Sequence, residues 1–456
     1  MAEIKRAERN EFIKKRSAEL GDRITIDRSY YEKNDVKRGL RNQDGTGVMA
    51  GVTRIGSIQG YYMRDGEKVP MEGKLYYRGI DVADIADGFL SEDRPGFEET
   101  AYLLLFGNLP NKESLEAFHG ILEKYRELPD GFTEDMILSA PSMNIMNKLA
   151  RSVLALYSYD EMPETDGRDL EAEIKRALYL LARCPVIVAN SYAAKRHYFE
   201  KGDLYLHRPQ HGLSMAENFL HSFRQDGNFT QEEARLLDLC MVLHAEHGGG
   251  NNSAFACRVL SSSGTDIYSA ISAAVGSLKG PRHGGANERV MNMFSYIERD
   301  VKDWRDEDEV SAYLEKIVRG EAAGGDGLIY GLGHAVYTKS DPRAIMLKDL
   351  ARSLAEKKGL LDELELFETV EKLGPGVFQR VKGGDKPLCA NVDMYSGLVY
   401  KMLEIPQDLY TPLFAIARMS GWCAHRLEEV FNGERIIRPA YKAIGLDDAY
   451  VRLEKR

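Results

Sequence analysis

The stretch Ile267-Tyr-Ser-Ala-Ile-Ser-Ala-Ala-Val-Gly-Ser-Leu278 decides the fold class. Its apolar side chains recur at i, i+4, i+7, i+8 and i+11, which places them on one face of an α-helix. The other positions are mostly serine, alanine and glycine, so neighbouring helices can approach closely on several sides. The pattern therefore predicts a buried helix that packs among other helices.

The same helical periodicity continues over most of the chain from Phe97 onward. The run 98–106 ends at Gly107, and the pattern restarts after Pro110 with Asn111 as the expected N-cap. No series of strands alternates with these helices, and no repeat of fixed period is visible. The fold is therefore expected to be all-α, or mainly α.

A short β region is expected before these helices. Residues 55–62 and 74–78 are β-prone runs, and Asp65-Gly-Glu67 and Pro70 separate them, so we expect small hairpins. Residues 1–40 are highly charged and predict a surface helix at their start.

Two domains are expected in the helical part. The charged region 298–321 and the Gly-rich turns that follow it indicate a more exposed module inserted into a larger helical body. We therefore expect a large domain from residues 1–290 plus 391–456 and a small domain from residues 291–390.

Charge and cysteine content exclude several classes of protein. The chain has 456 residues, with 61 Lys and Arg against 71 Asp and Glu, so the formal net charge is −10. No basic surplus is available to neutralise nucleic acid or an anionic membrane. The five cysteines lie far apart without a CxxC pair, which is typical of reduced thiols.

No obvious membrane or export signal is present in the sequence. The best apolar run, Pro185-Val-Ile-Val-Ala189, is far shorter than the roughly 18 residues that a membrane span needs. The first 23 residues contain four glutamates and no apolar core of a signal peptide. We expect a cytoplasmic protein with no nucleic-acid partner and no membrane partner.

Three of the ten histidines lie in loops rich in glycine or small residues, beside expected helix ends. They are His247 in His244-Ala-Glu-His-Gly-Gly-Gly-Asn-Asn252, His283 in Gly280-Pro-Arg-His-Gly-Gly-Ala-Asn287, and His334 in Gly331-Leu-Gly-His-Ala-Val-Tyr337. Such loops let a ligand approach the backbone closely. One histidine beside glycine also fits an ordinary helix end, but three together indicate a functional site. Six others are expected to be structural: His119, His197, His207, His211, His221 and His425.

One carboxylate and three arginines lie in comparable settings, namely Asp393, Arg343, Arg418 and Arg438. Arginine in a bidentate geometry binds carboxylates. A carboxylate base, with a neutral imidazole that holds an enolate oxygen, suits proton abstraction beside a carbonyl of an acidic substrate. The alternative is that the arginines form surface ion pairs and that Asp393 is a helix N-cap.

A metal site is the competing interpretation. His244 and His247 are three residues apart with Glu246 between them, and Asp393 could complete a ligand set. The spacing is HxxH, however, and not the HExxH that places two ligands and a base on one helix face. We therefore expect no metal.

The chain resembles the citrate synthases. The resemblance extends from about Leu75 to Arg438 and is most specific in His283-Gly-Gly-Ala-Asn287, in Gly333-His-Ala-Val-Tyr337 with Asp341-Pro-Arg343, and in Asn391-Val-Asp-Met-Tyr-Ser-Gly397. It implies a helical homodimer whose small domain closes over an active site in the cleft between the domains.

The resemblance also implies residue roles. Asp393 matches the base that takes a methyl proton from acetyl-CoA, His283 the imidazole that stabilises the enol, and His334 the group that protonates the oxaloacetate carbonyl. The expected ligands of the oxaloacetate and citrate carboxylates are His247, Arg343, Arg418 and, from the second subunit, Arg438.

Coenzyme A contacts are implied for Leu328, Ile329, Gly331, Gly333, Ala335, Lys339 and Asn391. The sequence departs from common family patterns at three places. Thr338 replaces a basic residue that binds the coenzyme A phosphates, Arg282 replaces an apolar residue, and Ala140-Pro-Ser-Met143 replaces a His-Pro-Met segment. The thioester is implied as a co-substrate, with no tightly bound cofactor.

The implied reaction is condensation of acetyl-CoA with oxaloacetate and hydrolysis of citryl-CoA to citrate and CoA. A 2-methylcitrate synthase that uses propionyl-CoA is the alternative, because one methylene is worth only about 1–3 kcal/mol in an apolar pocket. A catalytically silent binding protein is a further alternative, which the intact His283, His334 and Asp393 argue against.

Overall fold

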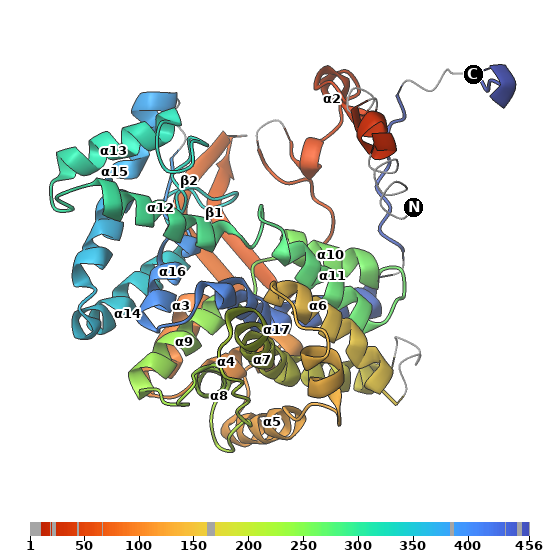
Figure 1. The fold of residues 1–456 in the computed structure, drawn as a ribbon, viewed down its shortest axis with the longest axis vertical. Coiled ribbons are helices and arrows are strands. Elements are labelled where there is room, and N and C mark those ends of the chain that lie inside the picture. The colour runs from red at the N-terminus through yellow and green to blue at the C-terminus, as the bar shows by residue number, and fades with distance from the viewer. Residues whose placement is uncertain are drawn as a thin grey trace. The chain divides into compact units, whose positions relative to one another are not determined.

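The computed structural model describes residues 11–18, 20, 24–42, 45–65, 67–161, 169–383, 387–433, 435–444 and 449–455. The chain divides into two units, one formed by residues 1–50 with 438–456 and the other by residues 51–437 (Figure 1).

The first unit contains the short helix α2 (Ser29–Lys33) and the 3₁₀ turns η1 (Arg38–Leu40) and η5 (Leu453–Lys455). Residues 11–18 are helical and exposed, which agrees with the expected surface helix; residues 1–10 lie outside the described part. None of the residues of α2, η1 or η5 is buried.

The second unit begins with a three-stranded antiparallel sheet of order β1-β2-β3, formed by β1 (Gly56–Arg64), β2 (Glu67–Tyr77) and β3 (Ile80–Asp81). The expected β region is confirmed: β1 and β2 form one hairpin and β2 and β3 a second, short one, but the first hairpin is longer than expected. Pro70 lies inside β2 opposite Tyr61, where the register shifts. An irregular register tolerates a residue without an N–H, so β2 continues through Pro70 and pairs with the whole of β1.

Helices make up most of this unit, which confirms the mainly α fold. They are α3 (Val82–Ser91), α4 (Phe97–Phe106), α5 (Lys112–Tyr125), η2 (Thr133–Leu138), α6 (Ile145–Ala155), η3 (Leu156–Tyr159), α7 (Leu170–Glu200), α8 (Met215–Phe223), α9 (Gln231–His244), α10 (Asn252–Ser261), α11 (Ile267–Lys279), α12 (Ala286–Asp300), α13 (Glu307–Arg319), α14 (Pro342–Lys358), α15 (Leu361–Lys382), α16 (Val392–Met402), η4 (Gln407–Leu409) and α17 (Tyr410–Asn432).

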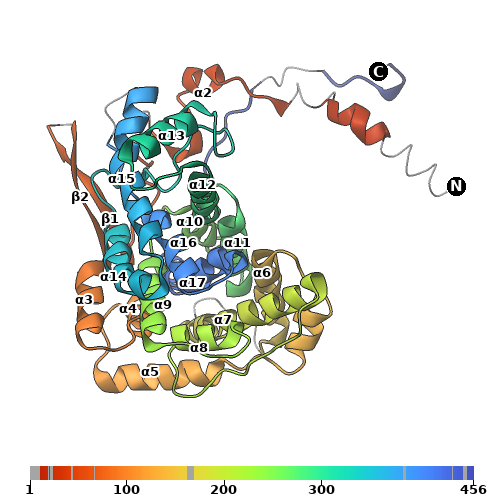
Figure 2. The ribbon, with the colours of Figure 1, turned by 60° about the vertical axis from the view of Figure 1, so that its left-hand side comes forward.

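Local signals set the helix ends as expected. Helix α4 stops at Gly107, whose φ of 88° is in the left-handed region that favours glycine. Helix α5 begins after Asn111, whose side chain accepts a hydrogen bond from the Ser114 N–H at 2.8 Å. The five stripe residues of α11 are all buried, and the helix packs against α6, α10 and α17 (Figure 2).

Helix α17 lies between the two ends of this unit. Figures 1 and 2 show α13 and α15 together at one end and α5 and α8 at the other, with α17 between them. The boundary expected at residue 290 falls within α12, so the division into residues 1–290 plus 391–456 and 291–390 stays a prediction.

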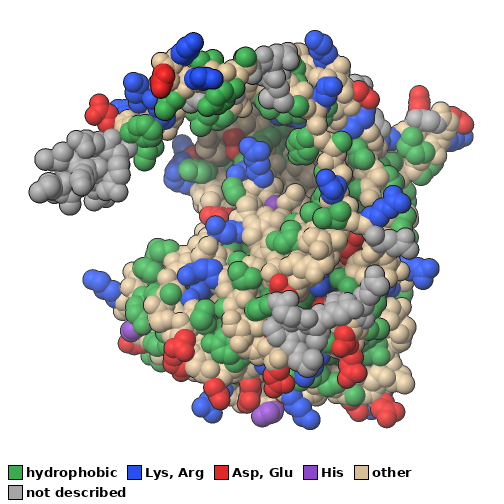
Figure 3. Space-filling model, turned by 90° about the vertical axis from the view of Figure 1, so that its right-hand side faces the viewer, with side chains coloured by type: hydrophobic (Ala, Val, Ile, Leu, Met, Phe, Trp, Pro, Cys, Tyr) green, Lys and Arg blue, Asp and Glu red, His purple; other side chains and the backbone are tan. Residues whose placement is uncertain are grey.

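Helix α7 is long and apolar enough to cross a membrane by length and composition, and 83% of its most apolar window is buried inside the protein. A buried core helix passes the same test. Charged side chains of both signs are interspersed with hydrophobic ones over the face drawn in Figure 3.

Candidate active site

The loops of His247 and His334 meet, and His283 lies close enough to help lower the pKa of His247. His247 follows α9, His283 precedes α12, and His334 lies between α13 and α14. The ring centres of His247 and His334 are 5.1 Å apart, and both rings contact Tyr337. Helix ends therefore bring together residues that are far apart in the sequence.

The loop around His334 sets which ring nitrogen of this residue carries the proton. Its Nδ1 accepts hydrogen bonds from the backbone N–H groups of Val336 and Tyr337, at 3.0 and 3.1 Å. A nitrogen that accepts cannot also hold the proton, so the neutral ring carries it on Nε2. His334 is thus prepared to donate from Nε2.

His247 is buried and neutral. Burial, followed by the charge of Arg343, holds its pKa well below the usual value for histidine. Its Nε2 is buried and has no hydrogen-bond partner among the described residues. A buried polar atom without a partner is rare in native proteins and points to a missing ligand or water.

Arg343 is held by a bidentate ion pair at the N-terminus of α14. Its Nε and Nη2 donate to the two carboxylate oxygens of Asp341 at 3.0 and 2.7 Å. Asp341 also accepts the Val392 N–H at 3.2 Å, which ties α14 to the start of α16. Burial opposes the charge on Arg343, but Asp341 outweighs it and raises the pKa of the guanidinium.

Arg418 lies in the middle of α17 and is 1% exposed. Its Nε donates to the carbonyl oxygen of His244, whereas Nη1 and Nη2 have no partner in the described part of the chain. Burial lowers its pKa to about 10, so it remains charged at neutral pH. Two unpartnered N–H groups on a buried cation form a ready site for an anionic oxygen.

Asp393 lies in the first turn of α16. Burial raises its pKa to about 6, although Arg343 and Arg418 partly oppose this effect. None of the hydrogen bonds between described residues involves its carboxylate; only its backbone N–H is engaged, by Asn391 Oδ1 at 3.0 Å. Such a carboxylate is ionised at neutral pH and is more basic than an exposed aspartate.

His283 is positioned by a serine that the sequence analysis did not identify. Its Nε2 lies 3.1 Å from Ser253 Oγ, which also accepts the Trp422 Nε1–H at 3.1 Å and donates to Asn251 Oδ1 at 2.9 Å. Burial, followed by Arg418, lowers the pKa of His283 to about 4, so the ring is neutral at pH 7. No local pattern distinguishes Ser253 from an ordinary helix-start residue.

The expected coenzyme A residues divide by exposure. Ile329 and Gly331 are buried; Gly331 has φ +87°, and a Cβ there would lie 2.9 Å from Met394 Sδ. Asn391 donates to the Gly333 carbonyl at 2.9 Å and shapes the loop. Three of the set are exposed, namely Leu328, Ala335 and Lys339.

The sequence departures have structural consequences. The Thr338 hydroxyl donates to the carbonyl oxygens of Gly60 and Met71 on the β1–β2 hairpin. Arg282 is exposed, and the Ala140 carbonyl accepts from Lys148 Nζ at 2.8 Å.

The remaining expected site residue, Arg438, belongs to the other unit of the chain. Arg438 is exposed and belongs to the first unit, whereas all the other site residues belong to residues 51–437. Within the described ranges, no group of three or more His, Cys, Asp and Glu side chains is arranged to hold a metal.

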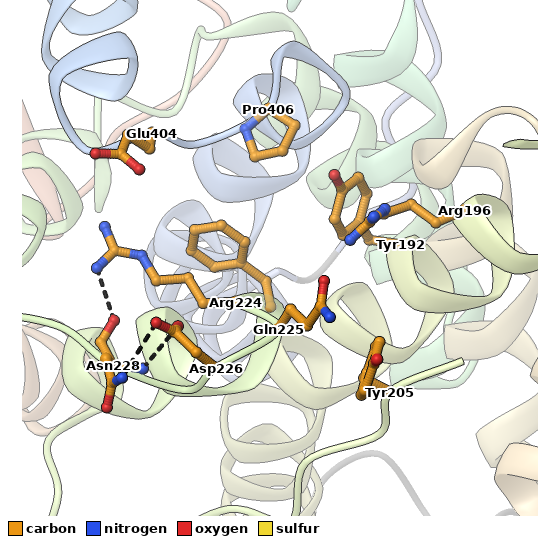
Figure 4. A pocket seen from close by; sticks show the side chains of 10 residues that line it. Tyr192, Arg196, Tyr205, Arg224, Gln225, Asp226, Asn228, Glu404 and Pro406 are labelled. Atoms are coloured by element: carbon orange, nitrogen blue, oxygen red, sulfur yellow. Dashed lines mark hydrogen bonds between the residues drawn. The ribbon is translucent and has the colours of Figure 1, made fainter. Parts of the chain in front are cut away.

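A separate groove lies at the ends of α7 and α8 (Figure 4). It has an empty volume of about 1100 Å³, and none of the expected site residues lines it. Its Arg224 is already engaged by Glu233 and by the Asn228 carbonyl oxygen.

Comparison with known proteins identifies the family. A sequence model described as "Citrate synthase, C-terminal domain" matches residues 43–440. Citrate synthase of Haloferax volcanii is 35% identical over 417 residues, which cover 91% of this chain and 97% of that protein. The 2-methylcitrate synthase 1 of Corynebacterium glutamicum is 32% identical over 425 residues, which cover 92% and 97%.

Solved structures agree. The ternary complex of Thermoplasma acidophilum citrate synthase with carboxymethyl coenzyme A and oxaloacetate matches with a TM-score of 0.74 and 28% identity, covering 92% of this chain and 99% of that chain. Citrate synthase of Pyrobaculum aerophilum matches with a TM-score of 0.72 and 32% identity, covering 90% and 94%. The chain therefore belongs to the citrate synthase family of enzymes.

Proposed function

We propose that the protein condenses acetyl-CoA with oxaloacetate and hydrolyses citryl-CoA to citrate and CoA. One observation carries this proposal. The unpartnered Nη1 and Nη2 of Arg418 and Nε2 of His247 are buried in a cluster that also contains the charged Arg343. Such an excess of buried donors and positive charge fits a small dicarboxylate, whose oxygens would satisfy them.

Asp393 is the proposed base. It removes a methyl proton from acetyl-CoA, and the electron pair of the C–H bond moves into the enol. A pKa of about 6 leaves Asp393 ionised at pH 7 and still basic enough to accept this proton.

His283 is the proposed donor to the enol oxygen. The Ser253 hydroxyl donates its one hydrogen to Asn251 Oδ1 at 2.9 Å, and His283 Nε2 is a second acceptor 3.1 Å away. In this proposal the hydroxyl turns from Asn251 to His283 Nε2, so the neutral ring carries its own proton on Nδ1 and can donate it towards the enol. A neutral imidazole suits this task because it holds the oxygen without adding a buried charge.

His334 completes the condensation in this proposal. The enol carbon attacks the ketone carbon of oxaloacetate and a C–C bond forms. The enol oxygen becomes a thioester carbonyl again and leaves its proton with His283, while the ketone oxygen takes the Nε2 proton of His334. Water then adds to the thioester carbon and forms a C–O bond; the C–S bond breaks, and the sulfur takes a proton from the water and leaves as the coenzyme A thiol. His247, Arg343 and Arg418 hold the substrate carboxylates, and no step requires a covalent enzyme intermediate.

Coenzyme A is the proposed co-substrate, held by the loop that contains Leu328, Ala335 and Lys339. Because the Thr338 hydroxyl is engaged by the hairpin, the exposed Lys339 is the proposed cation for the coenzyme phosphates.

We propose no metal. Activity should survive exhaustive chelation. If chelation abolishes activity and added zinc or iron restores it, the site contains a metal and this part of the proposal is wrong.

We further propose a cytoplasmic homodimer in which Arg438 serves the partner's site and the small domain closes over the ligands. The first unit supports this, because it exposes many large apolar side chains that a partner could cover. They include Ile24, Ile26, Tyr30, Leu40, Tyr441 and Val451.

A 2-methylcitrate synthase is the second candidate, because the Corynebacterium glutamicum relative carries that name at 32% identity. A steady-state assay with oxaloacetate, comparing acetyl-CoA with propionyl-CoA, tests both. We expect a higher kcat/KM for acetyl-CoA. A preference for propionyl-CoA would select the second candidate, and absence of turnover with either thioester would refute both.

A further inference from the structure

His247 is fixed by the residues on both sides of it. The Glu246 carbonyl oxygen lies 3.1 Å from the Tyr77 hydroxyl, and Glu246 Oε1 accepts the N–H of Gly248. Gly248 has φ +82°, a conformation that favours glycine. The backbone that carries His247 is therefore shaped mainly by the side chain of its neighbour, Glu246.

Glu246 is itself held from α17. It is 0% exposed, and its Oε1 lies 2.9 Å from His425 Nε2. His425 Nδ1 accepts from Arg258 Nη2 at 2.7 Å and from Nε at 3.1 Å. Because the guanidinium occupies the Nδ1 lone pair, the neutral His425 ring carries its proton on Nε2 and donates it to Glu246.

Arg258 anchors the outer end of this chain of contacts. It donates to Glu429 Oε2 at 2.9 Å, to Glu428, and to Thr53 Oγ1 at 3.1 Å. The Arg258 guanidinium therefore lies between the carboxylates of Glu428 and Glu429 on one side and His425 on the other. Burial opposes ionisation of Glu246, yet His425, Arg418 and the Gly248 N–H hold its pKa below the usual value.

The surrounding backbone leaves room for this carboxylate. A Cβ at Gly421 of α17 would lie 2.5 Å from Glu246 Oε2, and a Cβ at Gly56 of β1 would lie 2.9 Å from Glu246 Cγ. Two elements far apart in the sequence therefore lack side chains where the buried glutamate lies.

The geometry points to Glu246, His425 and Arg258 as a chain of positioning residues that sets the place of His247 in the oxaloacetate pocket. None of the three needs to touch substrate. This inference rests on the proposed function, because it assigns the pocket to oxaloacetate. It changes the role of His425, which the sequence predicted to be simply structural.

The test compares His425→Phe, which keeps a ring but removes both nitrogens, with His425→Gln, whose amide can accept from Arg258 and donate to Glu246. We expect His425→Phe to raise the KM for oxaloacetate about ten-fold or more, because small misplacements of binding groups are costly. The KM for acetyl-CoA should change less than about two-fold. His425→Gln should restore most of the oxaloacetate affinity.

The matched control is His221→Phe, a partly buried histidine on α8 whose ring contacts the Gly227 carbonyl. It should leave the KM for oxaloacetate unchanged. Arg258→Met is the second variant if His425→Phe does not fold, and it should shift the same KM. An unchanged KM for oxaloacetate in folded His425→Phe or Arg258→Met would overturn the inference.

The two proposals fail in different ways. If the wild-type protein does not turn over acetyl-CoA with oxaloacetate, the proposed function fails before any variant is made. If the wild type is active and the variants differ from it only in the amount of folded protein, the proposed function stands and the positioning role is refuted.

Discussion

Burial acts on each ionisable residue of the site according to the charge that the residue would carry. It lowers the pKa values of His247 and His283, so these rings are neutral, and it raises the pKa of Asp393 to about 6. Arg418 keeps its charge because its pKa falls only to about 10. One enclosed site therefore contains neutral donors, a strengthened base and fixed cations.

The role of Asp393 predicts a large and selective loss of turnover. Asp393→Asn keeps the size and removes the base, so turnover should fall by at least roughly 10²–10⁴-fold. Oxaloacetate affinity, measured by calorimetry, should stay close to that of the wild type, since the arginines remain. Near-normal turnover in Asp393→Asn would eliminate Asp393 as the base.

The same substitution should make the protein more stable above pH 6. The folded state holds the Asp393 proton more tightly than the unfolded state does, so wild-type stability is lost as pH rises through about 6. The variant does not ionise there, and at pH 8 it should gain on the order of 3 kcal/mol in the free energy of unfolding. Near pH 4 the gain should vanish. Denaturant unfolding at both pH values checks this, and an equal gain at both would exclude titration of Asp393 as its cause.

Single site residues could be predicted from the sequence where a neighbouring glycine marked a loop at a helix end. His247, His283 and His334 stand beside glycines, and the structure brings their loops towards one another. Ser253 and His425 were not predicted to belong to the site, because their partners His283 and Glu246 are 30 and 179 residues away. No local pattern records such contacts.

At the level of elements, α17 supports the site in two ways: it carries Arg418, and it has no side chain at Gly421. A Cβ at Gly421 would lie 2.4 Å from the Ala245 carbonyl oxygen, which precedes the loop of His247. The helix can therefore approach the end of α9 only with glycine at this position.

Gly421→Ala should therefore cost about 1–3 kcal/mol in the free energy of unfolding, as overpacked cores do, and should raise the KM for oxaloacetate. Gly88→Ala on α3 is the matched control, since nothing lies within 4 Å of a Cβ there. The control should be neutral or stabilising by up to about 1 kcal/mol. Equal effects of the two substitutions, measured by denaturant unfolding, would show that close approach at Gly421 is unimportant.

Helices and their ends could be predicted from the sequence where neighbouring residues alone determine them. The stripe of α11, the stop at Gly107 and the cap at Asn111 each follow from adjacent residues. Pro70 was expected to interrupt the strand, but its effect depends on the opposite strand. There the register shift at Tyr61 accommodates the proline. Pairing partners in a sheet are set by tertiary structure and not by the run itself.

At the scale of the whole molecule, the family model and the chain differ in extent. The family model matches residues 43–440. Most of the first unit, formed by residues 1–50 and 438–456, therefore lies outside the match. Arg438 belongs to the part of that unit that the family model includes. A residue that serves the partner's site would make the dimer the smallest active form.

Mixing two inactive variants tests this directly. Arg438→Ala and Arg418→Ala should each be nearly inactive alone, because in the proposed dimer each removes a carboxylate ligand from both sites. In the mixed dimer one site lacks both arginines and the other has both, so random exchange should restore about a quarter of wild-type activity.

The reciprocal mixture makes the test stricter. When wild type is mixed with an equal amount of the double variant Arg418→Ala/Arg438→Ala, every site of a mixed dimer lacks one arginine if Arg438 acts across the interface. Activity should then fall from about half to about a quarter of that of an all-wild-type sample as the subunits exchange. If Arg438 serves its own chain, each wild-type chain keeps a complete site, so activity stays at half and the first mixture gains nothing. The mass difference between tagged chains shows when subunit exchange is complete, and it must be complete in both experiments. Constant activity after full exchange would place Arg438 outside the partner's site.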